Sequence, residues 1–202
     1  NKMTVTDFRS ANKELLATAM TLCSDANPDE NGNAVGEPTE CALVNFATAN
    51  GVIKPETEAK QPRIGEVPFD SMRKMMTTVH KTSDGKIIQY TKGAPDELLR
   101  RCTKIITENG IEPLTDKKRA EILAQNKEMA DKALRVLAAA CRMHDSEPAE
   151  YTSEALERDL IFVGLCGMID PVRPEVLDAI KACRTAGIRP IMITGDHKDT
   201  AV

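Results

Sequence analysis

Aromatic residues are scarce in this sequence: its 202 residues include two Tyr, four Phe and no Trp. Proteins that bind single-stranded nucleic acid stack successive bases on aromatic rings, and proteins that bind duplexes neutralise phosphates with an excess of Lys and Arg. The formal net charge here is −4 at pH 7. The composition therefore argues against DNA or RNA as the main partner.

Metal-binding and membrane-spanning patterns are missing as well. The six Cys include no C-x-x-C pair and the three His are isolated, so we expect small buried thiols in a reducing compartment rather than a disulfide framework or a zinc site. No apolar run approaches the roughly 20 residues of a membrane helix. The start, "NKMTVTDF", is polar and lacks the apolar region of a signal peptide.

The phosphate-binding pattern G-x-x-x-x-G-K-[ST] does not occur either. The stretch "QYTKGAPDELLRRC" nevertheless places Lys92 at the end of an apolar run, directly before a Gly-Ala-Pro turn and a helical pattern. Glycine permits a tight turn, proline at the first helical position fixes φ, and free amides at a helix start attract anions. This geometry suits a phosphate or a nucleotide.

The first part of the chain, residues 9–165, alternates helical patterns with strand pairs. Asp-Gly and Asn-Gly steps between β-branched residues predict hairpins around Gly85 and Gly110. "LRVLAAACR", residues 134–142, fits either a continued helix or a buried strand. Residues 25–38 and 51–63 read as loops, and helices are predicted at residues 10–24, 39–50, 95–102, 115–133 and 153–158.

The last part has a different pattern. "LIFVGLCGMIDP", "PEVLDAIKACRTAG" and "IRPIMITGD" read as strand, helix and strand. This βαβ order predicts a parallel sheet, joined to the first part near residues 164–174. Polar groups after such strands, as in "MIDPVRP" and "ITGD", lie where open α/β sheets bind ligands.

Three further motifs carry candidate binding groups, although each has an ordinary structural explanation. In "PFDSMRKMM", Phe69 is either a core residue or a ring that stacks a base, with Arg73 and Lys74 placed to meet phosphates. In "VGEPTECAL", Glu37 and Glu40 either favour a helix N-terminus or accept a hydrogen bond from an adenine amino group. Lys92 is either a solvated lysine in a turn or a point charge near a nucleotide.

Taken in order, the motifs resemble the cytoplasmic part of P-type cation-transporting ATPases, and most of all the calcium-pump branch of bacteria. The resemblance covers essentially the whole chain and rests on "VGEPTE", "PFDSMRK", "TKGAPDELL", "LRVLAAA", "GMIDPVRP" and "MITGD". It implies an α+β nucleotide-binding domain, an antiparallel sheet flanked by helices, plus a partial α/β segment of the haloacid dehalogenase type. The implied division is a residual phosphorylation-domain or hinge segment at 1–8, the nucleotide-binding domain at 9–165 and partial phosphorylation domain at 166–202.

The resemblance also implies roles for single residues. Phe69 would stack on adenine, Lys92 would line the adenine pocket, and Glu40 would face the adenine edge. Arg135 of "LRVLA" would approach the phosphates, and Asp170 and Arg173 would belong to the hinge. The complete set of nucleotide-binding candidates is Glu40, Phe69, Arg73, Lys74, Lys92, Gly93, Arg135, Thr194, Gly195 and Asp196.

One departure from the family pattern limits the expected activity. The motif that holds the phosphorylated aspartate, Asp-Lys-Thr-Gly-Thr-Leu-Thr, is absent, as is the later acidic motif that holds magnesium. The resemblance therefore implies a fragment that binds ATP, with Mg²⁺ brought by the nucleotide, and has no catalytic residue of its own. Its partners would be the rest of the phosphorylation domain and the membrane domain of a pump in the cell membrane, with this region on the cytoplasmic side.

Two other readings compete with a nucleotide-binding fragment. A soluble phosphatase of the haloacid dehalogenase type needs an aspartate nucleophile in an Asp-x-Asp pattern after an apolar strand. No such strand precedes Asp7, and "MIDPVRP" lacks the second aspartate. An interaction module without a nucleotide would explain the motifs only as caps and turns.

Overall fold

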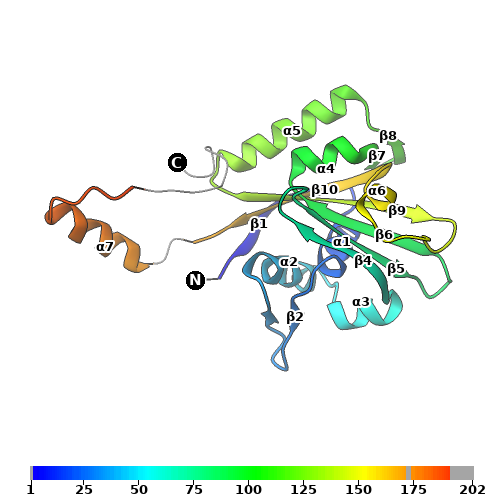
Figure 1. Ribbon diagram of the computed structural model, residues 1–202, viewed down its shortest axis with the longest axis horizontal. Coiled ribbons are helices and arrows are strands. Elements are labelled where there is room, and N and C mark those ends of the chain that lie inside the picture. The colour runs from blue at the N-terminus through cyan, green and yellow to red at the C-terminus, as the bar shows by residue number, and fades with distance from the viewer. Residues whose placement is uncertain (1, 172–173, 192–202) are drawn as a thin grey trace.

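The computed structural model describes residues 2–171 and 174–191. One eight-stranded sheet runs through them in the order β4-β5-β6-β9-β10-β7-β8, and β1 pairs with β10 on the same side as β7. All pairings in this sheet are antiparallel except that of β10 with β7. Helices cover both faces (Figure 1), so the fold is a mainly antiparallel α+β arrangement, as predicted.

The strands of the large sheet are β1 (Thr4–Arg9), β4 (Arg63–Asp70), β5 (Met75–Lys81), β6 (Ile87–Gly93), β7 (Cys102–Thr107), β8 (Gly110–Pro113), β9 (Arg135–His144) and β10 (Leu160–Ile169). A separate short pair is formed by β2 (Asn27–Pro28) and β3 (Ala34–Val35). The helices are α1 (Lys13–Leu22), α2 (Pro38–Ala49), α3 (Lys54–Lys60), α4 (Pro95–Arg101), α5 (Asp116–Ala130), α6 (Ser153–Leu156) and α7 (Pro174–Thr185).

Both predicted hairpins form. The β5–β6 turn contains Gly85 at φ 82°, a conformation that glycine adopts without the usual Cβ penalty. Gly110, at φ 109°, begins β8, which pairs with β7. Local turn chemistry therefore specifies these strand pairs.

The stretch at residues 134–142, left open between helix and strand by the sequence, lies almost entirely in the central strand β9 (Arg135–His144). It pairs antiparallel with β6 on one side and with β10 on the other. α5 has ended at Ala130, and Ala133 adopts φ 57°, so the helix does not continue into β9. The small residues Ala138, Ala139 and Ala140 are each 0% exposed, which allows helices to pack closely on both faces.

One predicted loop and two predicted helix starts need correction. Residues 51–63, expected to be a loop, contain α3, whose first residue Lys54 is 2% exposed and is held by distant backbone carbonyls. α1 is capped by Asn12 rather than Ser10, since Ser10 Oγ instead donates to the Val163 carbonyl at 2.7 Å. α2 starts at Pro38 with Glu37 as its N-cap, one residue before the predicted start.

The apolar strand at residues 160–169 does not open a separate parallel sheet. β10 pairs antiparallel with β9 and β1 inside the main sheet, so the prediction was wrong on this point. Both predicted domain boundaries, at residues 8/9 and 165/166, fall within these paired strands. The helix α7 follows as expected, but residues 188–191 form no strand and residues 192–196 lie outside the described residues. The haloacid dehalogenase-like segment therefore stays a prediction.

The core has a layer on each side of the sheet. α1 and α2 pack their apolar residues against one face, around Met76, Tyr90 and Ala139, and α4 and α5 pack against the other, around Ala138 and Leu165. Four cysteines are buried and two are half-buried, all as free thiols: Cys23, Cys102, Cys141 and Cys166, then Cys41 and Cys183. The sequence interpretation of the four buried cysteines as small core residues is thus confirmed.

Candidate functional site

The strand register brings several of the predicted binding residues to one end of the sheet. Met75 at the start of β5 pairs with Gly93 at the end of β6, and Gly93 pairs with Ala138 near the start of β9. The β4–β5 turn, the residues around Lys92 and the first residues of β9 are therefore neighbours, although they lie far apart in the sequence.

Lys92 and Glu40 form an ion pair on the α1–α2 side of β6. Lys92 Nζ lies 2.5 Å from Glu40 Oε1 and 3.0 Å from Ser24 Oγ. The Lys92 side chain is 8% exposed and that of Glu40 is 15% exposed. Lys92 is thus a largely buried, neutralised donor, and the solvated turn lysine considered above is ruled out.

The second oxygen of Glu40 binds the chain that follows α1. Glu40 Oε2 accepts hydrogen bonds from the backbone N–H groups of Asp25 at 2.8 Å and Ala26 at 3.1 Å. Glu40 lies in the first turn of α2, where the helix dipole favours a carboxylate. Its position is therefore fixed from three directions: by its helix, by Lys92 and by the 25–26 backbone.

Lys54 and Arg63 also bind the segment at residues 24–26, which follows α1. Lys54 Nζ donates to the carbonyls of Ser24 and Ala26, each at 2.7 Å, and Arg63 donates to Asp25 Oδ1 and to the Ser24 carbonyl. Burial lowers the pKa of Lys54, partly offset by the nearby Glu58 carboxylate. Sequence reasoning missed both cations, because α3 and β4 give no local sign that they pack on residues 22–26.

The β4–β5 turn carries the predicted stacking residue at the surface. Phe69 is 63% exposed. Asp70 Oδ1 accepts from the N–H groups of Met72 and Arg73 at 2.8 and 2.9 Å, and these backbone hydrogen bonds lower the Asp70 pKa. Lys74, at φ 55°, closes the turn.

Gly93 lets the β5 and β6 ends approach closely. A Cβ on Gly93 would lie 2.5 Å from the Lys74 carbonyl oxygen and 2.6 Å from Met75 Cβ. The same Lys74 carbonyl accepts from the Ala94 N–H at 3.0 Å. Two predicted residues, Lys74 and Gly93, are thereby brought together for a reason of backbone packing.

Arg73 points to the other face of the sheet. Its guanidinium pairs with Glu157, which also accepts from Thr77 Oγ1 at 3.3 Å. Thr77 and Thr91 share a hydrogen bond at 2.9 Å on that face, and Thr91 directly precedes Lys92, so the two side chains of β6 project to opposite sides. The structure therefore places Arg73 away from Lys92.

The remaining candidates are less closely associated. Arg135 is exposed at the start of β9, beside Met168 of β10. Asp170 is exposed just after β10. Thr194, Gly195 and Asp196, together with the hinge candidate Arg173, lie outside the described residues.

A sequence model of the family described as "P-type ATPase, cytoplasmic domain N" matches residues 12–175. This range runs from the N-cap of α1 to the second residue of α7 and so includes every element that builds the Lys92–Glu40 pair. The chain belongs to this P-type ATPase family.

Curated relatives agree with this family. Over the whole of this chain, calcium-transporting ATPase 1 of Bacillus cereus is 46% identical, and the match covers 24% of that protein. Calcium-transporting ATPase 1 of Lactococcus lactis is 41% identical over 98% of this chain and 22% of its own length. An endoplasmic reticulum-type calcium-transporting ATPase 3 of Arabidopsis thaliana is 36% identical over 92% of this chain and 21% of its own. The chain spans about a quarter of the length of the first two relatives.

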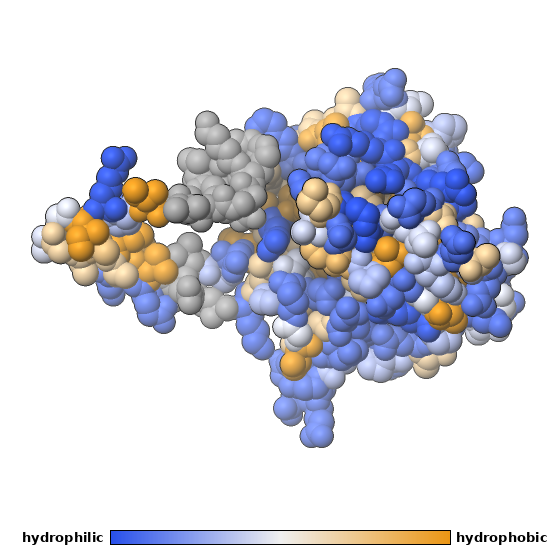
Figure 2. All heavy atoms as spheres, viewed as in Figure 1, coloured by the Kyte–Doolittle hydropathy of each residue, from blue (hydrophilic) through white to orange (hydrophobic). Residues whose placement is uncertain are grey.

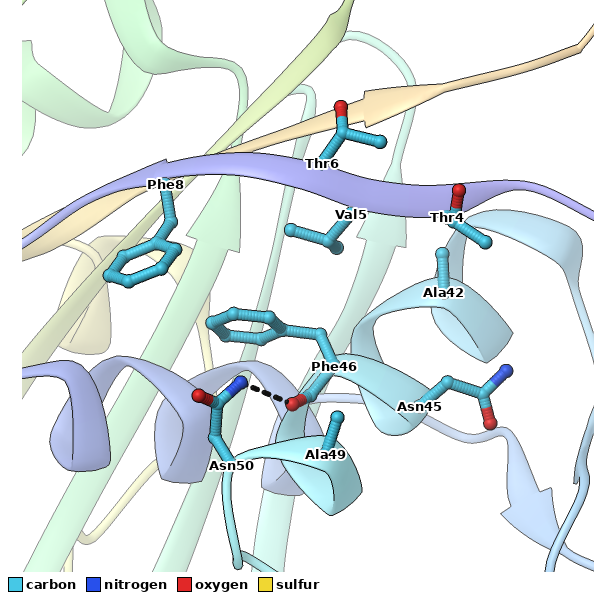
Figure 3. Close-up of a pocket in the computed structure, with 9 residues that line it drawn as sticks. All are labelled: Thr4, Val5, Thr6, Phe8, Ala42, Asn45, Phe46, Ala49 and Asn50. Carbon is cyan, nitrogen blue, oxygen red and sulfur yellow. Dashed lines mark hydrogen bonds between the residues drawn. The ribbon is translucent and has the colours of Figure 1, made fainter.

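Two cavities of this P-type ATPase domain lie away from Lys92. One, of about 380 Å³, separates β1 from α2 and is shown in Figure 3. Its walls include the tilted ring pair Phe8 and Phe46, 5.6 Å apart, and Asn50, whose amide donates to the Phe46 carbonyl. The other, of about 640 Å³, is lined by Lys2, Met3, Ala34, Gly36, Pro38, Cys41, Asn45, Asp170, Pro171 and Val176. Of the nucleotide-binding candidates that the structure describes, none lines either cavity.

The described residues contain neither a metal-binding cluster nor a membrane-spanning helix. Residues 2–171 and 174–191 contain no group of three or more His, Cys, Asp or Glu side chains arranged to hold a metal ion. Over the same ranges no helix combines the length and the apolar character needed to cross a bilayer.

Proposed function

We propose that this chain is the nucleotide-binding part of a P-type calcium-transporting ATPase and that it holds ATP for phosphoryl transfer to an aspartate outside this sequence. The observation that carries the proposal is the Lys92–Glu40 pair, which sits at the sheet end that also bears the exposed Phe69. Membership of the domain N family and the names of the relatives support it.

The paired groups keep hydrogen-bonding capacity for a base. A lysine ammonium has three donors, and Lys92 uses two of them, on Glu40 and Ser24. A carboxylate has about four acceptor sites, and Glu40 uses three, on Lys92 and on the N–H groups of Asp25 and Ala26. One remaining donor and one remaining acceptor match a ring nitrogen and the amino group of adenine.

The rest of the ligand would extend along the sheet end. Phe69 offers a solvent-facing ring for stacking, a contact worth about 1–3 kcal/mol per base. Lys74 and the exposed Arg135 supply positive charge for the phosphates, with Gly93 permitting the close approach of β5 and β6. Arg73 is not assigned to the phosphates, because its charge is already paired with Glu157. Mg²⁺ would arrive with the nucleotide.

The affinity for ATP should be modest. The favourable free energy from one stacked ring and a few partly solvated charges is only slightly larger than the cost of immobilising the ligand. We expect a dissociation constant between high micromolar and millimolar, or about −4 to −6 kcal/mol. Chemistry would follow from domain closure, which brings the bound ATP to its acceptor. The pump would lie in the cell membrane with this region on the cytoplasmic side, joined to the remainder of its phosphorylation and membrane domains.

The soluble phosphatase of the haloacid dehalogenase type is not favoured. The family match and the relatives point to a transport ATPase, and the described sheet is mainly antiparallel rather than the parallel sheet that such an enzyme needs. Sustained ATP hydrolysis by the purified chain would reverse this preference.

The test is a calorimetric titration of MgATP into the chain and two variants. Phe69→Ala removes the stacking ring, and Lys92→Met removes the charge while keeping most of the volume. We expect each to weaken ATP binding about tenfold, near 1.4 kcal/mol, or to abolish it.

A matched control is Ile111→Ala. Ile111 is an apolar residue of similar exposure, 58%, on β8 at the far edge of the sheet from β4, and its loss should leave ATP binding unchanged. If the folded chain does not bind ATP, or binds it equally well without Phe69 and Lys92, the proposal is wrong.

A further inference from the structure

A buried carboxylate lies on the face of the sheet opposite Lys92. Glu157 follows α6 directly, and its side chain is 0% exposed. Oε1 pairs with the Arg73 guanidinium and accepts from Thr77, whereas Oε2 has no hydrogen-bond partner among the described residues. A buried charge with an unpartnered oxygen opposes folding, so its presence calls for an explanation.

Arg73 connects this carboxylate to the candidate stacking residue. Its Nη1 lies on Glu157, and its Nη2 donates to the Pro68 carbonyl at 2.8 Å. Pro68 immediately precedes Phe69, so the guanidinium clamps the backbone next to the exposed ring. Within the turn, Asp70 accepts from the N–H groups of its close neighbours Met72, Arg73 and Lys74. The Lys74 carbonyl accepts from the Ala94 N–H at 3.0 Å and so anchors the Lys74 end of the turn, whereas Arg73 anchors the backbone beside Phe69.

Glu157 itself is held firmly. Its backbone carbonyl accepts a hydrogen bond from the Arg101 guanidinium at 3.4 Å. Its backbone N–H donates to the Ser153 carbonyl and so caps the end of α6. The preceding Leu156 carbonyl accepts from Gln89 of β6 at 2.9 Å. Glu157 is therefore held in place against β6, and Arg73 links it to the β4–β5 turn.

We propose that Glu157 is a positioning residue for nucleotide binding: through Arg73 it fixes the turn at residues 69–74 so that the Phe69 ring is presented to the base. The nature of the ligand rests on the proposed function. The proposal assigns the Arg73 guanidinium to holding the turn rather than to contacting the nucleotide directly.

Neutralising Glu157 distinguishes positioning from direct contact. Positioning predicts that Glu157→Gln and Arg73→Met both weaken ATP binding, by about threefold to tenfold. Direct contact predicts opposite effects: Arg73→Met weakens binding, but Glu157→Gln frees the guanidinium and strengthens it. The control is Glu150→Gln, which removes the same charge from an exposed position shortly before α6 and should leave ATP binding unchanged.

A double-mutant cycle separates positioning from a general loss of structure. If Glu157 acts through Phe69, Glu157→Gln should have little further effect on ATP binding once Phe69 is Ala, whereas independent effects add. Additive losses in Phe69→Ala/Glu157→Gln would overturn the proposal.

Amide hydrogen exchange tests, without any ligand, whether Glu157 fixes the turn. We expect Glu157→Gln to speed exchange at residues 71–74 selectively, with β6 and β9 amides unchanged, and Glu150→Gln to change neither. Unchanged exchange at the turn would contradict the claim that Glu157 fixes it, even if ATP binds. If the unsubstituted chain does not bind ATP, the proposed function and the role in affinity both fail, and the exchange result alone decides whether Glu157 fixes the turn.

Discussion

At the scale of single residues, buried polar side chains are the most informative part of this domain. Lys54, Lys92, His80, Gln89 and Glu157 are each less than a tenth exposed. Each hydrogen-bonds a residue far away in the sequence. Burial of such groups without partners would be costly, so each one reports a specific long-range contact that the fold requires.

His80 should make stability depend on pH. Its ring nitrogens bond the Gln61 carbonyl and Thr78 Oγ1, each at 2.9 Å, and burial lowers its pKa from 6.5 to about 4. Above pH 6.5 the ring is neutral in both the folded and unfolded chains, so its full contribution is present. As the pH falls from 6.5 towards 4 only the unfolded chain gains the proton, and up to roughly 3 kcal/mol of unfolding free energy is lost.

Urea unfolding at pH 7 and pH 5 tests the role of His80. The decrease in unfolding free energy between these pH values should be smaller in His80→Gln than in the unsubstituted chain. His144→Gln is the control, because His144 is only half-buried and its replacement should remove less of the pH dependence. An unchanged pH dependence in His80→Gln would show that other groups cause it.

At the scale of elements, α3 is the clearest case of structure determined by distant contacts. Its sequence "KPETEAK" is short and polar, and isolated helices of this length are not stable in water. The helix is fixed at its start by Lys54, whose ammonium reaches the two carbonyls of Ser24 and Ala26. The same segment supports Glu40, so α3 contributes indirectly to the candidate site.

Lys54→Met should therefore destabilise the domain. Two buried carbonyls lose a charged donor, and we expect a loss of about 1–3 kcal/mol in unfolding free energy, measured by urea titration. Lys60→Met, an exposed substitution in the same helix, should change it by less than about 0.5 kcal/mol. Equal losses in the two variants would show that the Lys54 contacts contribute nothing.

At the scale of the whole molecule, the main sheet and its helices contrast with α7. Leu177, Ile188 and Ile191 are between 59% and 77% exposed, and Figure 2 shows apolar side chains gathered on α7 while the rest of the visible face is mainly hydrophilic. Figure 1 shows α7 extending away from the sheet. The packed unit consequently comprises the elements from β1 to β10.

A pair of identical substitutions tests this boundary. Leu165→Ala removes a 0% exposed side chain from β10 and should cost about 2–5 kcal/mol of unfolding free energy. Leu177→Ala removes a side chain that is 62% exposed and should cost less than about 0.5 kcal/mol. A large loss in Leu177→Ala would mean that α7 packs on the sheet in solution.

Features that depend on neighbouring residues or on ordered motifs could be predicted from the amino-acid sequence. Asp-Gly and Asn-Gly predicted the two hairpins, the amphipathic patterns predicted most helices, and the ordered motifs predicted the P-type ATPase family. These signals act over a few residues, or are recognised as short stretches in a fixed order, so they can be read without knowing which segments meet.

The other features follow from long-range packing. It made residues 135–144 a central strand, placed residues 160–169 in the antiparallel sheet, joined Lys92 to Glu40 and turned Arg73 towards Glu157. Each outcome depends on partners from other elements of the chain or on burial on both faces of the sheet. Local propensity indicates neither these partners nor this burial, because the packing of a side chain and the desolvation of its charge depend on its neighbours in three dimensions.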